Sequence, residues 1–260
     1  MQTQSPNNPQ EHYIELIDVT KQFGNLVVLE QLNLSIKQGE TLALVGNSGT
    51  GKSILIKMLI GLLKPNSGKI LFENQEVHHY TEDEWMPLRR TTSMLFQANA
   101  LFDSLTVFEN IAYPLREHLT LTEEEITHKV KEVLDWVLLP GIEAQYPSEL
   151  SGGMRKRIGV ARAIVTKPSI ILYDEPTAGL DPISTTVVGN MIKRLQYQNG
   201  VTSIVITHDL RSAFEIGDRL ALLHNKKVHA IGSPEEMLQN TDPIVSNFFE
   251  GYRMMQEYLT

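Results

Sequence analysis

Apolar and polar residues alternate in two short segments near the start of the chain, residues 13–19 and 32–36. A period of two is typical of half-buried antiparallel strands, because successive side chains of a strand point to opposite faces of the sheet. Between the two segments, Phe23-Gly24-Asn25 has the composition of a turn. The pattern predicts an antiparallel β subdomain in this part of the chain.

Three later segments are nearly continuous apolar runs: Thr41–Val45, Ile170–Tyr173 and Ser203–Thr207. Such runs are typical of parallel strands that are buried on both faces. Gly46 and a helical pattern over Ile54–Leu63 follow the first run, and polar or charged residues follow the other two. We therefore expect an α/β fold with a mixed or parallel sheet, whose carboxyl edge is where ligands bind in open α/β sheets.

The middle of the chain has a helical pattern, most clearly over Glu123–Leu138, where apolar residues share one face and Glu and Lys the other. We expect residues 97–150 to form a helical subdomain inserted into a core built from residues 11–96 and 151–240. Residues 1–10 are rich in Gln, Asn, Ser and Pro and are expected to be disordered, not a signal peptide.

The last part of the chain predicts a hairpin around Asn225-Lys226 and a helix with Ser233 as its cap and Pro234 at its first position. Residues 241–260 are expected to form a helical extension. Its apolar residues recur every three to four positions, at Ile244, Phe248, Tyr252, Met255 and Leu259. This stripe can pack within the subunit or dock on a partner.

Composition limits the function. The chain has 23 basic and 31 acidic residues, a formal charge of −8, which argues against a nucleic-acid partner. It has no cysteine, so disulfides and thiolate metal sites are excluded. No apolar run approaches the ~18 residues that a membrane-spanning helix needs. We expect a cytosolic protein whose membrane role, if any, depends on a partner.

One motif directs the chemistry. The segment after the first apolar run is Gly46-Asn47-Ser48-Gly49-Thr50-Gly51-Lys52-Ser53. It matches the phosphate-loop pattern G-x-x-x-x-G-K-[ST] at every fixed position. In such a loop the backbone N–H groups surround the phosphates of ATP, and Ile54 follows at the start of the helix. Lys52 would reach the β- and γ-phosphates and Ser53 would bind Mg²⁺. The alternative is an ordinary glycine-rich turn between a strand and a helix.

Two adjacent carboxylates, Asp174 and Glu175, end the second apolar run. We expect Asp174 to help hold Mg²⁺, and Glu175 to act as general base on the attacking water. Solvated acids at a strand end are the alternative, which the phosphate loop makes the weaker one.

The segment Leu150-Ser151-Gly152-Gly153-Met154 precedes a helical pattern and resembles the signature motif of the ATPases of ABC transporters. The resemblance implies an ABC-type P-loop ATPase with a RecA-like ATP-binding core. It also implies a homodimer in which Ser151, Gly152 and Gly153 bind the ATP held by the other subunit. The alternative is a plain capped helix.

Other positions match the same family in order. Phe23 resembles the residue that stacks on adenine, and Gln97 resembles the glutamine that senses Mg²⁺ and water. Asp181 lies in a segment similar to the one that contacts the partner's nucleotide, and His208 resembles the histidine that contacts the γ-phosphate. Two positions differ from many relatives, which have glutamine at the position of Met154 and tyrosine at that of Phe23.

A longer stretch, residues 94–117, resembles the ATPase subunits of bacterial Mla-type intermembrane phospholipid transporters. This implies an integral-membrane permease dimer, a periplasmic lipid-binding ring of MCE type, and a small STAS-domain protein. The ATPase would lie on the cytoplasmic face of the bacterial inner membrane and help maintain outer-membrane lipid asymmetry. Candidates for the permease contact are Phe102, Leu105, Val107 and Phe108.

Other interpretations stay open at this point. An ABC ATPase for an amino acid, another solute or a drug would share every catalytic residue. Soluble ABC proteins that act on ribosomes or DNA usually carry two cassettes, and a non-hydrolysing module would normally lack Glu175 or Ser151. His78 and His79, near Glu76 and Asp83, are expected to form a solvated loop instead of a metal site.

Overall fold

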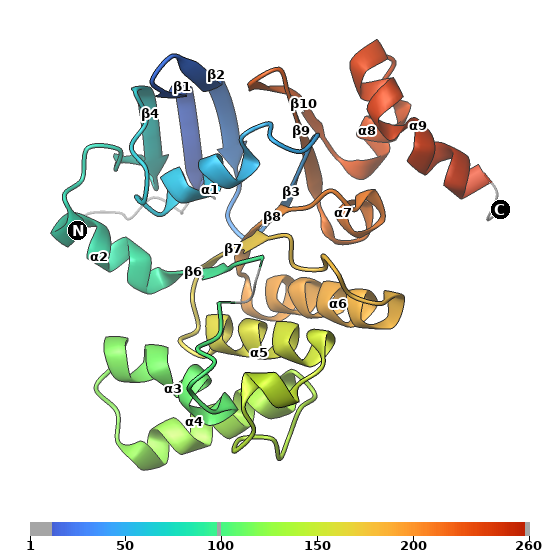
Figure 1. Ribbon diagram of the computed structural model, residues 1–260. Helices are drawn as coiled ribbons and strands as arrows, with labels where there is room; N and C mark the ends of the chain where they lie inside the picture. Colours follow the sequence, from blue (N-terminus) through green and yellow to red (C-terminus); the bar gives the residue numbers. More distant parts are fainter. Residues whose placement is uncertain (1–11, 98–99, 258–260) are drawn as a thin grey trace, which may run out of the picture.

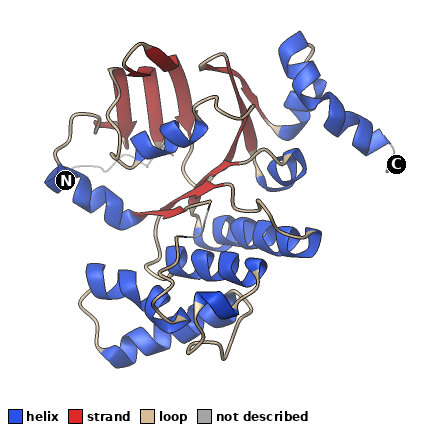
Figure 2. Ribbon diagram, viewed as in Figure 1, coloured by secondary structure: helices blue, strands red, loops and turns tan. Residues whose placement is uncertain are grey.

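The computed structural model describes residues 12–97 and 100–257 (Figure 1). The predictions for residues 1–10 and for Leu259 lie outside the described residues. Strands form two sheets, and helices pack between and below them (Figure 2). Within the described ranges, no helix combines the length and the apolar character that a membrane crossing requires.

The larger sheet has the strand order β10-β9-β3-β8-β7-β6. The strands are β10 (Lys227–Gly232), β9 (Arg219–His224), β3 (Thr41–Val45), β8 (Thr202–Ile206), β7 (Ile170–Asp174) and β6 (Thr92–Leu95). Neighbours are parallel except for β9 and β10, which form the predicted hairpin through Asn225 and Lys226. Every residue of β3 and β8 is buried, as their continuous apolar runs predicted. The α/β fold class is therefore confirmed.

The two faces of this sheet belong to different cores. Alternate residues such as Leu42, Leu172 and Ile204 pack with α1 (Lys52–Leu59) and the smaller sheet. Their neighbours Ile171 and Val205 pack on the opposite face. That face is covered by α5 (Gly152–Ile164) and α6 (Pro182–Asn199), while α7 (Leu210–Ile216) packs near β3 (Figure 1).

The smaller sheet is the predicted antiparallel one, with the order β2-β1-β4-β5. Its strands are β1 (Ile14–Phe23), β2 (Leu26–Ile36), β4 (Ser67–Phe72) and β5 (Gln75–Glu76). Ile14 pairs with Ile36. Beside this sheet lies α2 (Glu82–Thr91), which begins with a capping box formed by Thr81 and Glu84.

The middle of the chain is helical, as predicted. It contains α3 (Val107–His118) and α4 (Glu123–Trp136), which pack on each other and on α5 (Figure 1). A short 3₁₀ turn, Pro147–Glu149, leads into α5. The division of the chain into an inserted subdomain and a core remains a prediction.

Two helices end the described chain: α8 (Pro234–Gln239), capped by Ser233 as predicted, and α9 (Pro243–Glu257). The buried residues of α9 are Val245 and Phe249, which pack against α7 and α8. The predicted stripe lies beside them, with the Tyr252 ring stacked on Phe214 at 4.2 Å and Met255 exposed. α9 thus packs within the subunit from Val245 to Tyr252, and its last turn leads to the C-terminal end of the chain (Figure 1).

Several predicted boundaries were wrong by a few residues. The helix after the phosphate loop ends at Leu59, not Leu63, because Gly61 turns the chain with φ of 70°. A Cβ there would lie 2.3 Å from the Trp85 ring, so only glycine fits this close approach. The helix predicted over Glu123–Leu138 ends at Trp136.

Candidate nucleotide-binding site

The loop between β3 and α1 contains the predicted phosphate-binding motif, Gly46–Ser53. Gly46 has φ of 147° and Gly51 has φ of 101°, in the region that favours glycine. A Cβ on Gly46 would lie 2.4 Å from the Leu223 carbonyl oxygen, and one on Gly51 would lie 2.9 Å from Cδ2 of Leu29. Both glycines are therefore required by the packing of the loop on β9 and β2. Because Gly51 precedes α1 and has no side chain to cap it, the first N–H groups of the helix can bind an anion.

Lys52 is the first residue of α1 and is 7% exposed. Its Nζ atom donates hydrogen bonds to the carbonyl oxygens of Gly46 at 2.7 Å and Asn47 at 2.9 Å. Burial lowers the pKa of Lys52, and the carboxylates of Glu175 and Asp174 oppose that shift. The ammonium group is thus held inside the loop and within electrostatic reach of two carboxylates.

Asp174 ends β7 beside the same loop. The Ser53 hydroxyl donates a hydrogen bond to Oδ1 of Asp174 at 3.3 Å. Burial raises the pKa of Asp174, the Ser53 hydrogen bond acts in the opposite direction, and the neighbouring Glu175 adds to the rise. A hydroxyl and a carboxylate in contact supply the hard oxygen ligands that Mg²⁺ prefers.

Glu175 has φ of 52°, a left-handed conformation that is uncommon for a residue other than glycine. Its backbone N–H donates to the Ile206 carbonyl at 2.9 Å. Oε2 of Glu175 lies 2.9 Å from Nδ1 of His208 and accepts a hydrogen bond from the His208 backbone N–H at 3.3 Å. The Glu175 side chain is 13% exposed and that of His208 is 66% exposed. The carboxylate is therefore fixed at the sheet edge by a histidine that faces solvent.

These side chains line one pocket of about 440 Å³. Val28 and Ile206, which the sequence did not single out, also line it. The predicted residues in its walls are Ser48, Gly49, Thr50, Gly51, Lys52, Ser53, Ile54, Gln97, Asp174, Glu175 and His208. Gly46 and Asn47 line an adjacent pocket of about 610 Å³, together with residues of α9 such as Ile244.

Five predicted residues, all within the described ranges, line neither pocket: Phe23, Ser151, Gly152, Gly153 and Asp181. Phe23 ends β1 and is 45% exposed, with Nζ of Lys21 at 5.0 Å from its ring centroid. Ser151, Gly152 and Gly153 form the start of α5, where Oγ of Ser151 accepts a hydrogen bond from a backbone N–H.

Asp181 caps α6. Its carboxylate accepts hydrogen bonds from the Ser184 backbone N–H at 2.9 Å and from the Ser184 hydroxyl at 2.6 Å. The hydroxyl contact in particular lowers the pKa of Asp181. Within one subunit, then, Ser151 and Asp181 are exposed helix caps that line neither pocket.

The sequence prediction missed Lys156 of α5. This residue is 2% exposed and lies within electrostatic reach of Asp174 and Glu175. A signal was available, because Lys156 is spaced from Val160 and Ala163 by helical steps that place all three on the buried face. A charged residue at such a position needs a partner inside the protein.

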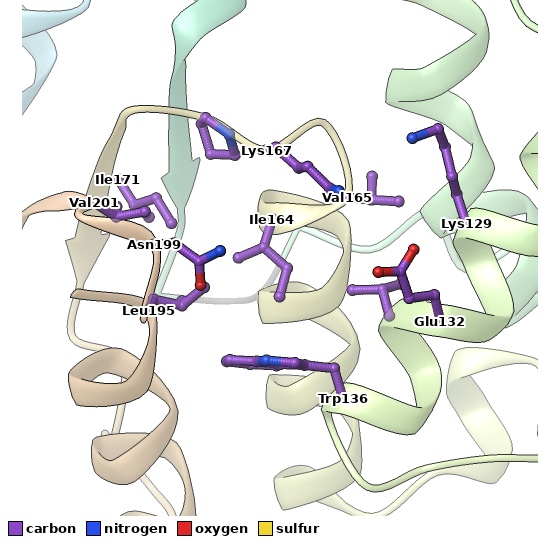
Figure 3. Close-up of a pocket in the computed structure, with 12 residues that line it drawn as sticks. Lys129, Glu132, Trp136, Ile164, Val165, Lys167, Ile171, Leu195, Asn199 and Val201 are labelled. Atoms are coloured by element: carbon purple, nitrogen blue, oxygen red, sulfur yellow. The ribbon is translucent and has the colours of Figure 1, made fainter. Parts of the chain in front are cut away.

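Two other features lie away from this site. A cavity of about 240 Å³ lies between α4, α5 and α6, and Trp136 forms one wall while Ile164 and Leu195 line its interior (Figure 3). Potential ligand atoms of Glu76, His78 and His79 lie within 4.8 Å of one another, but the Glu76 carboxylate is paired with Lys69 and Asp83 is not in the group. The side chains of Glu76 and His78 are half-buried, so the loop is less solvated than the sequence predicted, and the absence of a metal site remains a prediction.

Known proteins identify the family. Residues 29–178 match the family model described as ABC transporter. The chain belongs to the ABC transporter family. It is an ABC-type ATPase of the kind coupled to transport, and it binds ATP.

Two relatives are equally similar in sequence. Over 241 residues the chain is 41% identical to the intermembrane phospholipid transport system ATP-binding protein MlaF of Haemophilus influenzae, an alignment that covers 93% of this chain and 91% of that protein. It is also 41% identical to the probable ribonucleotide transport ATP-binding protein mkl of Mycobacterium leprae, with 93% and 70% covered. MlaF of Escherichia coli is 37% identical over 238 residues, with 92% and 88% covered.

Solved structures agree with the fold. An ATP-binding cassette in a dimeric post-hydrolysis state bound to ADP and Pi superposes with a TM-score of 0.79 at 31% identity, covering 85% of this chain and 98% of that chain. The structure of cbiO1 from Clostridium perfringens, part of an ABC transporter complex, gives 0.82 at 28% identity, covering 95% and 100%.

Proposed function

We propose that this chain is the ATPase subunit of a transporter that moves phospholipid between the inner and outer membranes. The observation that carries the ATPase part is the meeting of Lys52, Ser53, Asp174 and Glu175 in one pocket. The lipid part is supported by the MlaF relatives, which this chain matches over nearly their whole length.

In the proposed reaction, the loop N–H groups and Lys52 bind the ATP phosphates. Glu175 accepts a proton from the attacking water, while His208 holds the carboxylate in place through the contact at 2.9 Å. Gln97 lines the same pocket and positions the water. Phe23 stacks on adenine, which its 45% exposed ring permits without rearrangement of the core.

The same pocket fits Mg²⁺, because Ser53, Asp174 and Gln97 all bring oxygen atoms to it. When bound, the ion neutralises charge on the β- and γ-phosphates. Ser53 and Asp174 would hold it, since their side chains already contact each other, and Gln97 of the same pocket would be a third ligand.

A second copy of the chain completes the site in this proposal. Ser151 and Gly152 are exposed at the start of α5, and a Cβ on Gly152 would have no atom within 4 Å. An anion could therefore approach the first N–H groups of α5 without steric conflict. Asp181, the exposed cap of α6, would contact the same nucleotide from the second subunit. The dimeric state of the superposed ATP-binding cassette supports this assembly.

The permease surface is proposed to include Phe102, which is 44% exposed and lies 5.2 Å from the 45% exposed ring of Tyr113. Asn110 is fully buried. Its Oδ1 accepts a hydrogen bond from the Phe102 N–H at 2.8 Å, and its Nδ2 donates one to the Phe102 carbonyl at 3.1 Å. Two exposed aromatic rings on a fixed backbone suit a protein interface. Of the other candidates, Val107 is fully buried, so it belongs to the core, and Leu105 and Phe108 are partly buried.

Further partners follow from the same likeness. We propose an integral-membrane permease dimer, a periplasmic MCE-type lipid-binding ring and a small STAS-domain protein. The ATPase would then lie at the cytoplasmic face of the inner membrane, held there through the permease.

Ribonucleotide transport is the second candidate, because the mkl relatives carry that name at the same identity. The two can be separated with the complex purified from native membranes through a tagged chain and reconstituted in liposomes. The expected result is ATP-dependent transfer of fluorescent phospholipid and no uptake of labelled ribonucleotide. The Glu175→Gln complex is the control for dependence on hydrolysis. Ribonucleotide uptake without lipid transfer would overturn the cargo but leave the ATPase site intact.

A further inference from the structure

Lys156 occupies an unusual position for a lysine. It lies in the second turn of α5, five residues after Ser151, and is 2% exposed. Burial of an ammonium group is costly unless charges and hydrogen bonds compensate it. The surroundings of Lys156 therefore indicate why the residue is charged.

Lys156 donates a hydrogen bond to Gln97, a residue that lines the nucleotide pocket. Nζ of Lys156 donates to the backbone carbonyl of Gln97 at 2.7 Å. Burial lowers the pKa of Lys156, while the carboxylates of Asp174 and Glu175 oppose that shift. The same two carboxylates act on Lys52 from α1. Lys156, like Lys52, is therefore a buried ammonium group within electrostatic reach of both carboxylates.

A second contact from α5 reaches the same segment. Nη1 of Arg162 donates to the Ala100 carbonyl at 2.8 Å, and the guanidinium carbon lies 5.9 Å from the Phe102 ring centroid. Helix α5 therefore contacts the backbone at Gln97 and again at Ala100. Through Lys156 and Arg162, α5 therefore contacts both Gln97, which lines the pocket, and the exposed ring of Phe102.

We propose that Lys156 is a positioning residue for ATP hydrolysis, which holds Gln97 near Asp174 and Glu175 and links that arrangement to α5. The inference rests on the proposed role of Gln97 in the pocket. Lys156 acts through the Gln97 backbone and does not touch the nucleotide.

A purely structural role predicts something different. If α5 needed only to fill space, methionine would match the lysine stem in volume and avoid the cost of burying a charge. Lys156→Met would then leave turnover unchanged. If Lys156 positions Gln97, the same change releases the Gln97 carbonyl and turnover falls.

The test uses the full-length chain in the complex purified from native membranes. Lys156→Met is expected to lower kcat at least about tenfold and to change the KM for ATP less than about twofold, because the phosphate loop is untouched. Arg157→Met is the matched control. Arg157 lies on the same helix but donates to the Val137 and Leu138 carbonyls at 3.3 and 3.2 Å, away from the pocket, so kcat should stay near wild type.

Lys156→Gln is a second variant at this position, for use if Lys156→Met does not fold. Its shorter amide falls short of the Gln97 carbonyl, so the same loss of kcat is expected. Thermal unfolding of each variant confirms that the fold is intact. A kcat within twofold of wild type in a folded variant at position 156 would overturn the inference.

The Gln97→Ala variant tests the role of Lys156 separately from the proposed role of Gln97. If Lys156 acts through Gln97, the double variant has the kcat of Gln97→Ala alone, because the two changes remove one effect. Multiplied losses would show that Lys156 acts by another route and would overturn the inference. Wild-type kcat in Gln97→Ala would instead remove the proposed role of Gln97, and with it the basis for Lys156.

Discussion

His208 contacts Oε2 of Glu175 twice, with Nδ1 at 2.9 Å and with its backbone N–H at 3.3 Å. The two residues follow neighbouring parallel strands, β7 and β8, whose carboxyl ends meet at one edge of the sheet. Strand pairing thus sets the distance, since the Glu175 N–H also bonds Ile206 at the end of β8. The imidazole therefore contacts a carboxylate whose backbone is already fixed.

His208→Ala should slow hydrolysis without abolishing ATP binding. The backbone contact to Glu175 remains, but the imidazole no longer orients the carboxylate, and loss of orientation at a reacting group can cost about a hundredfold in rate. Steady-state ATPase assays should show a lower kcat with little change in KM. His79→Ala, which removes an exposed histidine elsewhere, is the control. An unchanged kcat in His208→Ala would remove the histidine from the mechanism.

Lys52→Ala should weaken nucleotide binding itself. The change removes the ammonium group and its bonds to Gly46 and Asn47, so the loop loses both charge and internal support. A hydrogen bond to a charged group contributes about 1.5–3 kcal/mol, which corresponds to a rise of about 10- to 150-fold in Kd. Isothermal titration with ATP measures this directly. Lys64→Ala serves as the control, and equal affinity in both variants would contradict the assignment.

The motif residues were predictable because they depend on local backbone and on strand ends. Gly46 and Gly51 are required by steric contacts of the loop, and Asp174, Glu175 and His208 follow continuous apolar runs that form β7 and β8. A parallel sheet brings such ends together whatever the rest of the chain does.

Other features depend on contacts between distant parts of the chain and were missed. The sequence gives little sign of α2, since Pro87 interrupts it and Trp85 is its buried residue, packed against Gly61 from another segment. In α9 the buried residues Val245 and Phe249 lie beside the predicted stripe, because α7 and α8 decide which face is covered. The partner of Lys156 likewise depends on the path of a segment nearly sixty residues away.

Among the described residues, four α-helices begin with a capping box whose glutamate should make stability depend on pH: Glu84, Glu109, Glu125 and Glu236. Backbone hydrogen bonds from the cap residues hold the pKa of each below its ordinary value of 4.5. Their contribution is therefore complete above pH 4.5 and is lost as the pH falls through the lower pKa of the folded state.

The unfolding temperature should accordingly fall as the pH is lowered from about 6 to about 3. Changing the four glutamates to glutamine should lower the unfolding temperature at neutral pH and flatten its dependence on pH. Differential scanning calorimetry of both proteins tests this. An equally steep acid dependence in the fourfold variant would show that other carboxylates are responsible.

The central claim is that this chain hydrolyses ATP with Glu175 as general base in a site completed by a second copy. It is tested most directly with Glu175→Gln, which keeps the shape of the side chain and removes the base. Light scattering and ATPase assays on the same preparation give both readouts. The account expects ATP to bind and to convert the variant to a stable dimer, with turnover lost. Wild-type turnover by Glu175→Gln would contradict it.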